Sequence, residues 1–561
     1  MEVTRRDLLT LAAIAAGAGL LPRETFAQAT SPERLLDFEP LGNVTLLHMT
    51  DSHAALLPVY YREPDTLLPI GDEAGKPPYI TGEAALKYYG FAPGSLDAHA
   101  FTHVDFAELA RRYGKMGGYA HIATLVKRIR AERPGKVLFF DGGDTLQGSA
   151  TSNWTQGRDM VDAINQLGVE MLSPHWEFTF GIDKIKEYFG DLEKPGVFKG
   201  EFLAHNVMDV TWKEPIFKPY AIRRIGGVAV GVIGQAFPYT PISHPRKYVP
   251  DLTFGIQEAQ VQKYVDELRD DKKVDVVVLL SHNGFDVDMK LASRVKGLDA
   301  IFGGHTHEVI PRMLQVGQTR VIRSGAHGKY LARLDLDVRD GRIRAHRFKM
   351  IPVLSSHIPE DPDMAKLIKS IRAPYEKKLT EVLAVSESLL YRRGNFNGTF
   401  DEVILDALLK HYDAEVAFSP GFRWGVSLLP GQPITYEDVF THMALPYPNT
   451  WAREMTGMEI RTIMEDVADN LFNADPYYRQ GGDMVRVGGV SYTIDPKKSI
   501  GQRITDLTLG GKPMDMSRKY KATGWASIND VDGPPAYDVL ADHLRAVKRV
   551  KIDRASRVRV V

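Results

Sequence analysis

Cysteine is absent from the 561-residue chain, which excludes disulfide bonds, thiolate metal sites, iron–sulfur clusters and cysteine nucleophiles. An excess of either charge is also missing, because 70 basic against 71 acidic residues give a formal net charge of −1. This balance gives no indication of a nucleic acid or an anionic membrane as partner. Internal repeats and low-complexity tracts are lacking as well. Any chemistry must therefore rest on His, Asp, Glu, Asn, Ser or a metal.

The composition is that of a packed globular protein, with 44% hydrophobic, 25% charged and 9% aromatic residues. A chain of 561 residues predicts two to four domains of about 150 residues each.

Residues 1–29 have the layout of an export signal. Arg5 and Arg6 precede an apolar stretch from Leu8 to Leu21, and Ala27-Gln28-Ala29 supplies a small-residue cleavage site. The alternative is a membrane anchor, but about 14 apolar residues fall short of the ~20 that a spanning helix needs. We therefore expect export by the twin-arginine route, removal of the segment and a mature periplasmic protein without a membrane anchor.

From Asn43 onward, runs of Val, Ile and Leu end in polar or glycine-rich tips: NVTLLHMTDSH, KVLFFDGGD, VAVGVIGQAF, VDVVVLLSHNG and LDAIFGGHTH. Such runs predict strands that are buried on both faces. Helical stretches at Ala120–Glu132 and Gln257–Asp270 lie between them, and this alternation predicts an α/β layer architecture. Most candidate site residues directly follow a strand, at the edge where open α/β sheets bind ligands.

The domain organisation follows from the same pattern. Residues 40–350 form the predicted first domain, in which the Pro-, Gly- and aromatic-rich residues 54–118 read as a long insertion without a clean period. Residues 351–385 form a linker with an amphipathic helix over about 365–382. Residues 386–561 form the predicted second α/β domain.

Five short clusters carry histidine or carboxylate side chains that can bind a metal ion: Asp51-Ser-His53, Gly143-Asp144, His175-Trp-Glu177, His282-Asn283 and Gly304-His305-Thr-His307. Side chains two residues apart at a strand end point the same way, so each Asp-x-His or His-x-His pair can reach one ion. Imidazole and carboxylate suit Mn, Zn or Fe, and two ions about 3.5–4 Å apart form a hydrolytic clamp. A lone histidine is more often structural, but five clusters in order favour a two-metal site.

The order DxH, GGD, a third motif with His, HN and GGHTH resembles the calcineurin-like metallophosphoesterases. GKMGGYAHIATLVKRIR, FSPGFRWGVSLLPGQPITYEDVF and LPYPNTW are similar to segments of the 5′-nucleotidases. The resemblance implies an α/β (α+β layered) fold, with an N-terminal calcineurin-like metallophosphoesterase sandwich and a C-terminal 5′-nucleotidase-type domain. It implies that one ion is held by Asp51, His53, Asp144 and His307, and the other by Asp144, His175, His282 and His305.

The third motif departs from the nucleotidase pattern. The family has G-N-H-E-F-D where this chain has PHWEFT, so His175 takes the ligand position, Trp176 replaces a catalytic His and Thr179 replaces its Asp. Trp offers one N–H donor and cannot act as a general acid. Nucleotidases stack the nucleobase between two aromatic residues of the second domain. Here Asp483 stands at the position of one of them, and Tyr537 is the candidate for the other. Both departures argue against a nucleotide substrate.

The motif HWEFTFG is similar to that of the thiosulfohydrolases of the bacterial sulfur-oxidation (Sox) pathway. That resemblance implies two Mn²⁺ ions, although Zn²⁺ satisfies the same ligands. It also implies a substrate, a cysteine S-thiosulfonate on the flexible Gly-rich arm of a SoxYZ-like sulfur-carrier protein, from which water releases sulfate. We expect a monomer.

Five residues form the predicted catalytic set: Asp144, His175, Trp176, Asn283 and Arg423. Arg423 matches the position at which the family presents an Arg to an anionic substrate, and a surface turn is the alternative. Asn283 would orient the attacked group or hold a turn. Trp176 is expected to line the pocket.

Two other functions stay open. A periplasmic 5′-nucleotidase or UDP-sugar hydrolase would use the same metal ligands, and a metal-containing binding component would dock partners without catalysis. Hydrolysis of AMP would indicate the first of these.

Overall fold

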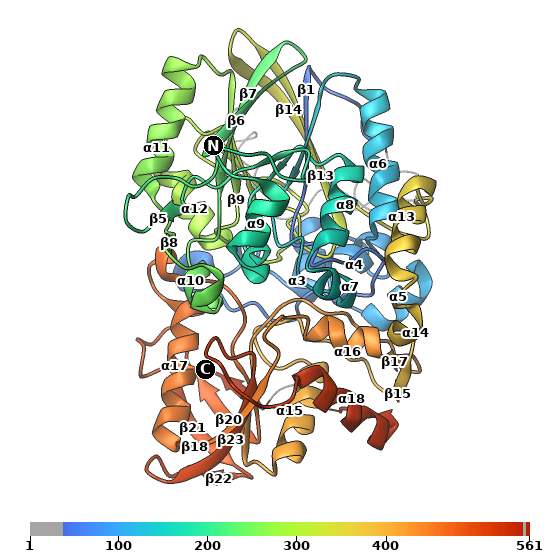
Figure 1. Cartoon of the computed structure of the whole chain (residues 1–561), viewed down its shortest axis with the longest axis vertical. Helices are drawn as coiled ribbons and strands as arrows, with labels where there is room; N and C mark the ends of the chain where they lie inside the picture. The colour runs from blue at the N-terminus through green and yellow to red at the C-terminus, as the bar shows by residue number, and fades with distance from the viewer. Residues whose placement is uncertain (1–36, 554–556) are drawn as a thin grey trace, which may run out of the picture.

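The computed structural model describes residues 37–553 and 557–561, so the predicted export signal at 1–29 lies outside the described residues. Figure 1 shows two lobes stacked along the longest axis, with the N-terminal lobe above the C-terminal one. Among the described helices, none combines the length and the apolar character needed to cross a bilayer.

Two six-stranded sheets form the centre of the N-terminal lobe in the described part of the chain. The first runs in the order β14 (Arg342–Pro352), β13 (Tyr330–Arg339), β1 (Val44–Met49), β2 (Val137–Asp141), β3 (Met171–Leu172) and β4 (Glu201–Phe202). The second runs in the order β11 (Leu314–Val316), β12 (Thr319–Arg323), β10 (Ala300–Gly303), β9 (Val276–Ser281), β7 (Val228–Gln235) and β6 (Tyr220–Ile225). Apolar side chains from both sheets form one buried cluster, so the sheets pack as a sandwich.

Helices cover both outer faces of this sandwich. The first sheet packs against α6 (Tyr119–Glu132), α8 (Arg158–Leu167) and α13 (Pro362–Arg372), and the second against α11 (Glu258–Asp266) and α12 (Phe285–Arg294). The predicted layered α/β class is confirmed, because strands buried on both faces need helices on the outside.

Strand register brings the predicted site residues to one edge. β1 and β2 are parallel with Met49 opposite Asp141, and β9 and β10 are parallel with Ser281 opposite Gly303. The loops that carry the predicted ligands therefore leave the sandwich together, at the edge that faces the second lobe.

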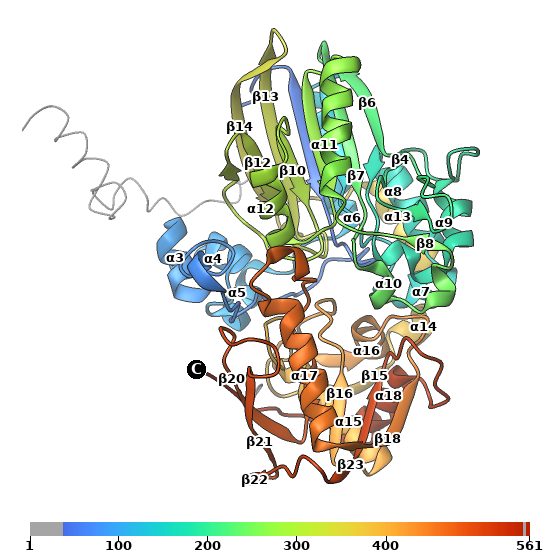
Figure 2. The same cartoon turned by 90° about the vertical axis from the view of Figure 1, so that its left-hand side faces the viewer.

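Residues 54–118 are more regular than the sequence indicates. Figure 2 shows them as a small helical lobe beside the sandwich, formed by α3 (Gly82–Tyr89), α4 (Leu96–Phe101) and α5 (Phe106–Tyr113). These helices span only six to eight residues, so a helical period has too few turns to stand out.

The connection between the lobes is not the single helix expected over 365–382. Helix α13 ends at Arg372, α14 covers Glu376–Leu379, and strand β15 (Val382–Ser386) already belongs to the C-terminal lobe. Pro374 explains the break, because proline lacks an N–H and collides with the preceding turn of a helix.

The C-terminal lobe contains three small sheets among the described residues. The strands besides β15 are β16 (Val416–Ser419), β17 (Pro433–Thr435), β18 (Thr450–Thr456), β19 (Arg486–Gly488), β20 (Val490–Ile494), β21 (Ile504–Leu509), β22 (Lys512–Pro513), β23 (Lys519–Trp525), β24 (Arg549–Val550) and β25 (Val558–Val560). The helices are α15 (Thr399–Tyr412), α16 (Tyr436–His442), α17 (Gly457–Phe472) and α18 (Ala536–Val547).

Candidate dimetal centre

The loops that follow the strands have an uncommon backbone conformation. Five of the seven predicted ligands have positive φ: Asp51 (51°), His53 (45°), Asp144 (57°), His305 (81°) and His307 (61°). Residues other than glycine rarely adopt this region, and they persist there when the surrounding structure holds them. Such residues cluster at functional sites, which agrees with five of them meeting at one edge.

The structure brings all seven side chains together in two buried groups. The first group is Asp51, His53, Asp144 and His307, and the second is Asp144, His175, His282 and His305. Within each group the candidate ligand atoms lie within 4.8 Å of one another. The two groups coincide with the two ligand sets that the family resemblance implies, and Asp144 is shared.

The Asp144 carboxylate is the centre of the arrangement. Its Oδ2 lies 3.2 Å from His282 Nε2 and 3.6 Å from His53 Nε2, while Oδ1 lies 3.1 Å from His175 Nδ1. Burial raises the pKa of Asp144, but the imidazoles of His282 and His175 outweigh burial and hold that pKa well below its usual value. The carboxylate therefore stays ionised and can face two cations at once.

The other nitrogen of several imidazoles is held from outside the centre. His282 Nδ1 donates to the Gly142 carbonyl at 2.5 Å, and His305 Nε2 donates to the Gln480 carbonyl at 2.7 Å. His53 Nδ1 lies 3.1 Å from Gln147 Oε1. Such outer contacts fix the ring orientation and leave one nitrogen of each ring facing the centre.

The inward nitrogens show that the site fits metal ions. Within the described part of the chain, His305 Nδ1 is buried without a hydrogen-bond partner, and His282 Nε2 and His175 Nδ1 face the Asp144 carboxylate at 3.2 and 3.1 Å. A buried polar atom without a partner costs free energy, and a cation would satisfy His305 Nδ1 and bind the other two nitrogens together with the carboxylate. Imidazole and carboxylate donors match Mn²⁺, Zn²⁺ and Fe²⁺.

Asp51 completes the first group under a strong burial penalty. Its Oδ1 lies 3.3 Å from His307 Nε2 and accepts the His305 backbone N–H at 2.9 Å. Burial raises the pKa of Asp51 to about 7, although the nearby His282 opposes that shift. A cation in this group would lower the pKa again.

Glu177 supports the centre through the backbone. The sequence suggests a partner for a ligand imidazole, but the Glu177 carboxylate instead accepts the backbone N–H groups of His175 at 2.8 Å and Thr145 at 2.7 Å. It also accepts the N–H of Asp144 at 3.3 Å. One buried carboxylate thus fixes the loop of Asp144 against the loop of His175.

A cavity of about 200 Å³, which we call the aromatic cavity, opens onto the centre from the C-terminal lobe. It is lined by Trp176, Phe237, Phe422, Arg423, Trp424 and Asp483, together with five of the predicted ligands. Trp176 is 5% exposed, and its ring lies 5.2 Å from that of Trp424, edge to face. Trp176 therefore forms a wall beside the metal groups.

Arg423 is buried in this wall and is not in an exposed turn. Its guanidinium donates to the backbone carbonyl of His305. Arg393, which the sequence did not single out, donates to the Thr306 carbonyl at 3.1 Å and to Asp483 at 3.3 Å. No motif surrounds Arg393, and only the fold brings its loop to the GGHTH segment.

Three further predictions meet different surroundings. Asp483 is ion-paired with Arg486 at 2.8 Å as well as with Arg393, so its charge is neutralised. Asn283 is fully buried, donates to Asp288 at 3.2 Å and lines neither cavity at the centre, which favours the turn role. Tyr537 packs on Phe440, with ring centroids 4.6 Å apart, away from the aromatic cavity.

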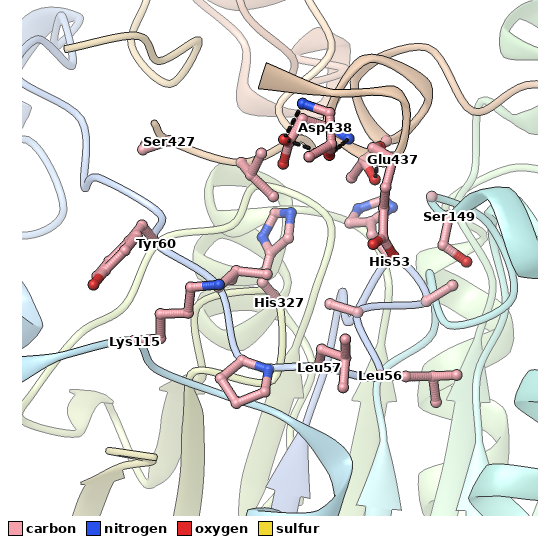
Figure 3. A pocket seen from close by; sticks show the side chains of 18 of the residues that line it. His53, Leu56, Leu57, Tyr60, Lys115, Ser149, His327, Ser427, Glu437 and Asp438 are labelled. Atoms are coloured by element: carbon pink, nitrogen blue, oxygen red, sulfur yellow. Dashed lines mark hydrogen bonds between the residues drawn. The ribbon is translucent and has the colours of Figure 1, made fainter. Parts of the chain in front are cut away.

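A second cavity of about 290 Å³, the polar cavity, meets the centre at His53. His53 lines both cavities. Figure 3 shows the polar cavity with His53 and His327 on one side and Ser427, Glu437 and Asp438 of the C-terminal lobe on the other. His327 belongs to no motif, and the sequence did not indicate it.

Comparison with known proteins agrees with this geometry. A model of the 5′-nucleotidase C-terminal domain matches residues 382–534. The 5′-nucleotidase of Bos taurus is 24% identical over 459 residues, which are 72% of this chain and 76% of that protein. The protein UshA of Yersinia enterocolitica is 23% identical over 493 residues, 76% of this chain and 84% of its own length.

Solved structures extend the likeness to the whole fold. The sulfate thiohydrolase SoxB of Thermus thermophilus, in complex with glycerol, has a TM-score of 0.89 at 38% identity and covers 94% of this chain and 98% of its own. A 5′-nucleotidase precursor from Thermus thermophilus has a TM-score of 0.71 at 22% identity over 92% of this chain and 99% of its own, a likeness of fold.

Proposed function

The chain is a hydrolase of the 5′-nucleotidase family and belongs to its SoxB-type members, and from this premise we propose that it is a thiosulfohydrolase. Its substrate would be a cysteine S-thiosulfonate on a SoxYZ-like sulfur-carrier protein, and its products sulfate and the carrier with one sulfur retained. The observation that carries the proposal is Trp176, a buried aromatic wall at the position where the nucleotidase motif has a catalytic His.

The proposed reaction needs no general acid at this position. Water adds its oxygen to the terminal sulfonate sulfur, the sulfur–sulfur bond breaks, and sulfate and two protons are released. The carrier keeps the remaining sulfur as an anion. A sulfur anion is stable near neutral pH, unlike an alkoxide, so a proton donor contributes little and Trp176 is tolerated.

The metal groups and Arg423 would share the handling of charge. Two ions held by the two groups would lower the pKa of water and neutralise oxyanion charge. Arg423, whose guanidinium lines the aromatic cavity beside His305, can grip sulfonate oxygens with two parallel N–H donors. We propose Mn²⁺ as the ion, and Zn²⁺ would satisfy the same donors.

We also propose that the protein works as a monomer in the periplasm, after export by the twin-arginine route. The arrangement of Arg5, Arg6 and the small residues at Ala27–Ala29 supports this location. The burial of the centre, where His175 and Asp144 are each 1% exposed, supports a carrier whose thiosulfonate sits on an extended arm.

The test is sulfate release from a thiosulfonate-loaded carrier, run beside phosphate release from AMP on the same Mn²⁺-loaded protein. We expect sulfate release at rates of about 1–10³ s⁻¹ and AMP hydrolysis at least ~10³-fold slower. AMP hydrolysis at such rates without sulfate release would show a nucleotidase instead. Neither activity in a protein with two bound ions would show a binding component.

A further inference from the structure

His327 is a buried histidine that the proposed chemistry leaves unused. It is 1% exposed, and within the described residues both of its ring nitrogens lack a hydrogen-bond partner. His442 is the other described histidine with two such nitrogens, but it stacks on Phe400 and lines neither cavity. His327 lines the polar cavity, where a ligand from solution can meet the free nitrogens.

The surroundings place this ring beside the metal groups. Its centroid lies 5.7 Å from that of His53 and 6.1 Å from that of His307. The backbone N–H of His327 donates to the Asp51 carbonyl at 2.8 Å, and the ring packs on Tyr61 with centroids 4.0 Å apart. Backbone and ring are thus both fixed, which holds His327 in the wall of the polar cavity beside His53, and we call this end of the cavity, next to the metal groups, its inner end (Figure 3).

The polar cavity suits a small anion. At about 290 Å³ it is several times the ~30 Å³ of one water molecule. Lys115 lines it without an ion-pair partner among the described residues. Its two carboxylates are engaged, because Arg372 pairs with Glu437 at 2.5 and 2.9 Å and Asp438 accepts from Thr435 at 2.6 Å.

We propose that the inner end of the polar cavity is a binding site for a tetrahedral oxyanion, to which the His327 ring donates a hydrogen bond. On the proposed function, which this inference rests on, that oxyanion is the released sulfate, held beside the centre while the carrier still occupies the aromatic cavity. His53 lines both cavities, so this site would adjoin the centre on the side away from Trp176 and Arg423, which line the aromatic cavity alone.

The experiment measures the dissociation constant of inorganic sulfate, and in a parallel arm of inorganic phosphate, by calorimetry on Mn²⁺-loaded full-length mature protein. His327→Phe keeps the packing on Tyr61 but removes both nitrogens, and we expect sulfate to bind at least about tenfold more weakly. His327→Gln restores an N–H donor, and its dissociation constant for sulfate is expected to lie within about threefold of that of the unchanged protein. Tighter binding of sulfate than of phosphate identifies the product of the proposed reaction, and the reverse identifies a phosphate site.

The matched control is His442→Phe, which makes the same change at another fully buried histidine that lines neither cavity. Its sulfate affinity is expected to be unchanged. Unchanged affinity in His327→Phe, or equal weakening in both Phe variants, overturns the proposal. If His327→Phe does not fold, Thr441→Trp fills the polar cavity from α16 and must weaken sulfate binding instead.

The two proposals fail separately. If a loaded carrier releases no sulfate but His327→Phe still weakens sulfate binding, the thiosulfohydrolase proposal is wrong and the anion-site proposal stands. Sulfate release with unaltered binding in His327→Phe removes the anion site alone.

Discussion

The two lobes contribute to one centre in different ways. The N-terminal lobe supplies all seven predicted metal ligands, and each comes from a loop after a strand or short turn of the sandwich. The C-terminal lobe supplies none of them, but adds Arg423, Trp424 and the Gln480 carbonyl that fixes His305. The fold of one lobe therefore determines the metal site, whereas substrate contact depends on how the second lobe is held against it.

A strap of the N-terminal lobe, residues 60–70, holds the second lobe. The Tyr60 carbonyl accepts the N–H of Ser427 at 2.6 Å, and the N–H of Arg62 donates to the Ser427 hydroxyl at 3.0 Å. Further along, the N–H of Leu68 donates to Asn395 Oδ1 at 2.6 Å. The long insertion thus contributes backbone hydrogen bonds across the interface, next to Arg423.

The largest effect is expected from Asp144→Asn, which removes the shared charge of the N-terminal lobe. Both ion groups lose their common anionic ligand, so metal content should fall, and sulfate release should fall by at least about 10³-fold. Metal content by plasma mass spectrometry and the sulfate assay measure the two effects. Retention of two ions with full activity would show that Asp144 is not the shared ligand of the two ions.

Asp141→Asn is the matched control for that change. Asp141 is also fully buried, but its carboxylate belongs to neither metal group, and it accepts the Gly143 N–H at 3.0 Å and the Thr145 hydroxyl at 2.7 Å. Burial raises the pKa of Asp141 to about 8, so an uncharged amide resembles its state near neutral pH. We expect two bound ions and activity within a few fold of the unchanged protein.

The second effect is the pH dependence of metal binding, which belongs to the N-terminal lobe alone. Burial lowers the pKa of His282, but the Asp144 and Asp51 carboxylates outweigh burial and raise that pKa to about 9 in the metal-free protein. An ion must displace this proton, so its affinity should rise about tenfold per pH unit well below that pKa, and about fiftyfold from pH 7 to 9. Calorimetry on metal-free protein measures this dependence, and a constant affinity over that range contradicts it.

The stability of the metal-free protein should change in the opposite direction. A histidine whose pKa rises on folding contributes stability that is complete below its ordinary value of 6.5 and is lost as the pH passes 9. The melting temperature of metal-free protein should therefore contain a falling component between these values. Metal-loaded protein should lack that component, because the ion replaces the proton.

A smaller effect is expected from Arg423→Met in the C-terminal lobe. The change removes the guanidinium from the aromatic cavity but leaves every predicted ligand in place, so two ions should remain bound. The value of kcat/KM for the loaded carrier should fall about ten- to hundredfold, the range for losing hydrogen bonds to a charged group. Loss of metal together with activity would mean that this lobe supports the ions as well.

The sequence predicts the site residues of the N-terminal lobe better than those that the C-terminal lobe contributes, for a physical reason. The ligands of the N-terminal lobe follow continuous apolar strands, so parallel register brings short motifs such as GGHTH to one edge. Arg393 and His327 carry no such pattern, because each stands alone in a loop and meets the centre only through tertiary packing. Pro374 was a readable signal, and the break after α13 could have been predicted from it.

The same limit applies to the residues around the motifs. A Glu two positions after His175 was expected beside an imidazole, but helical turns of the 176–180 segment direct it to backbone N–H groups. The sequence places Asp483 where the nucleotidases have an aromatic residue, but its pairing with Arg393 depends on two loops of the C-terminal lobe that are 90 residues apart in the chain. Motif spacing predicts which ligands meet, whereas pairing between distant loops depends on the packed fold.

The smallest effect is expected at the exposed edge of the interface between the lobes. Lys290 of α12 pairs with Asp475 at 2.6 Å and lies 3.9 Å from the centroid of the Tyr477 ring. Lys290→Met removes both contacts, and the free energy of unfolding should fall by about 1 kcal/mol, because such partly exposed pairs are screened by water. Urea denaturation measures this change.

Lys247→Met is the control, because it breaks the more exposed pair with Asp530 and should cause no measurable change in the free energy of unfolding. Since the buried strap and Arg423 stay in place, both variants should keep full sulfate release. A large loss of activity in Lys290→Met would show instead that the edge of the interface, and not the strap, sets the position of the second lobe.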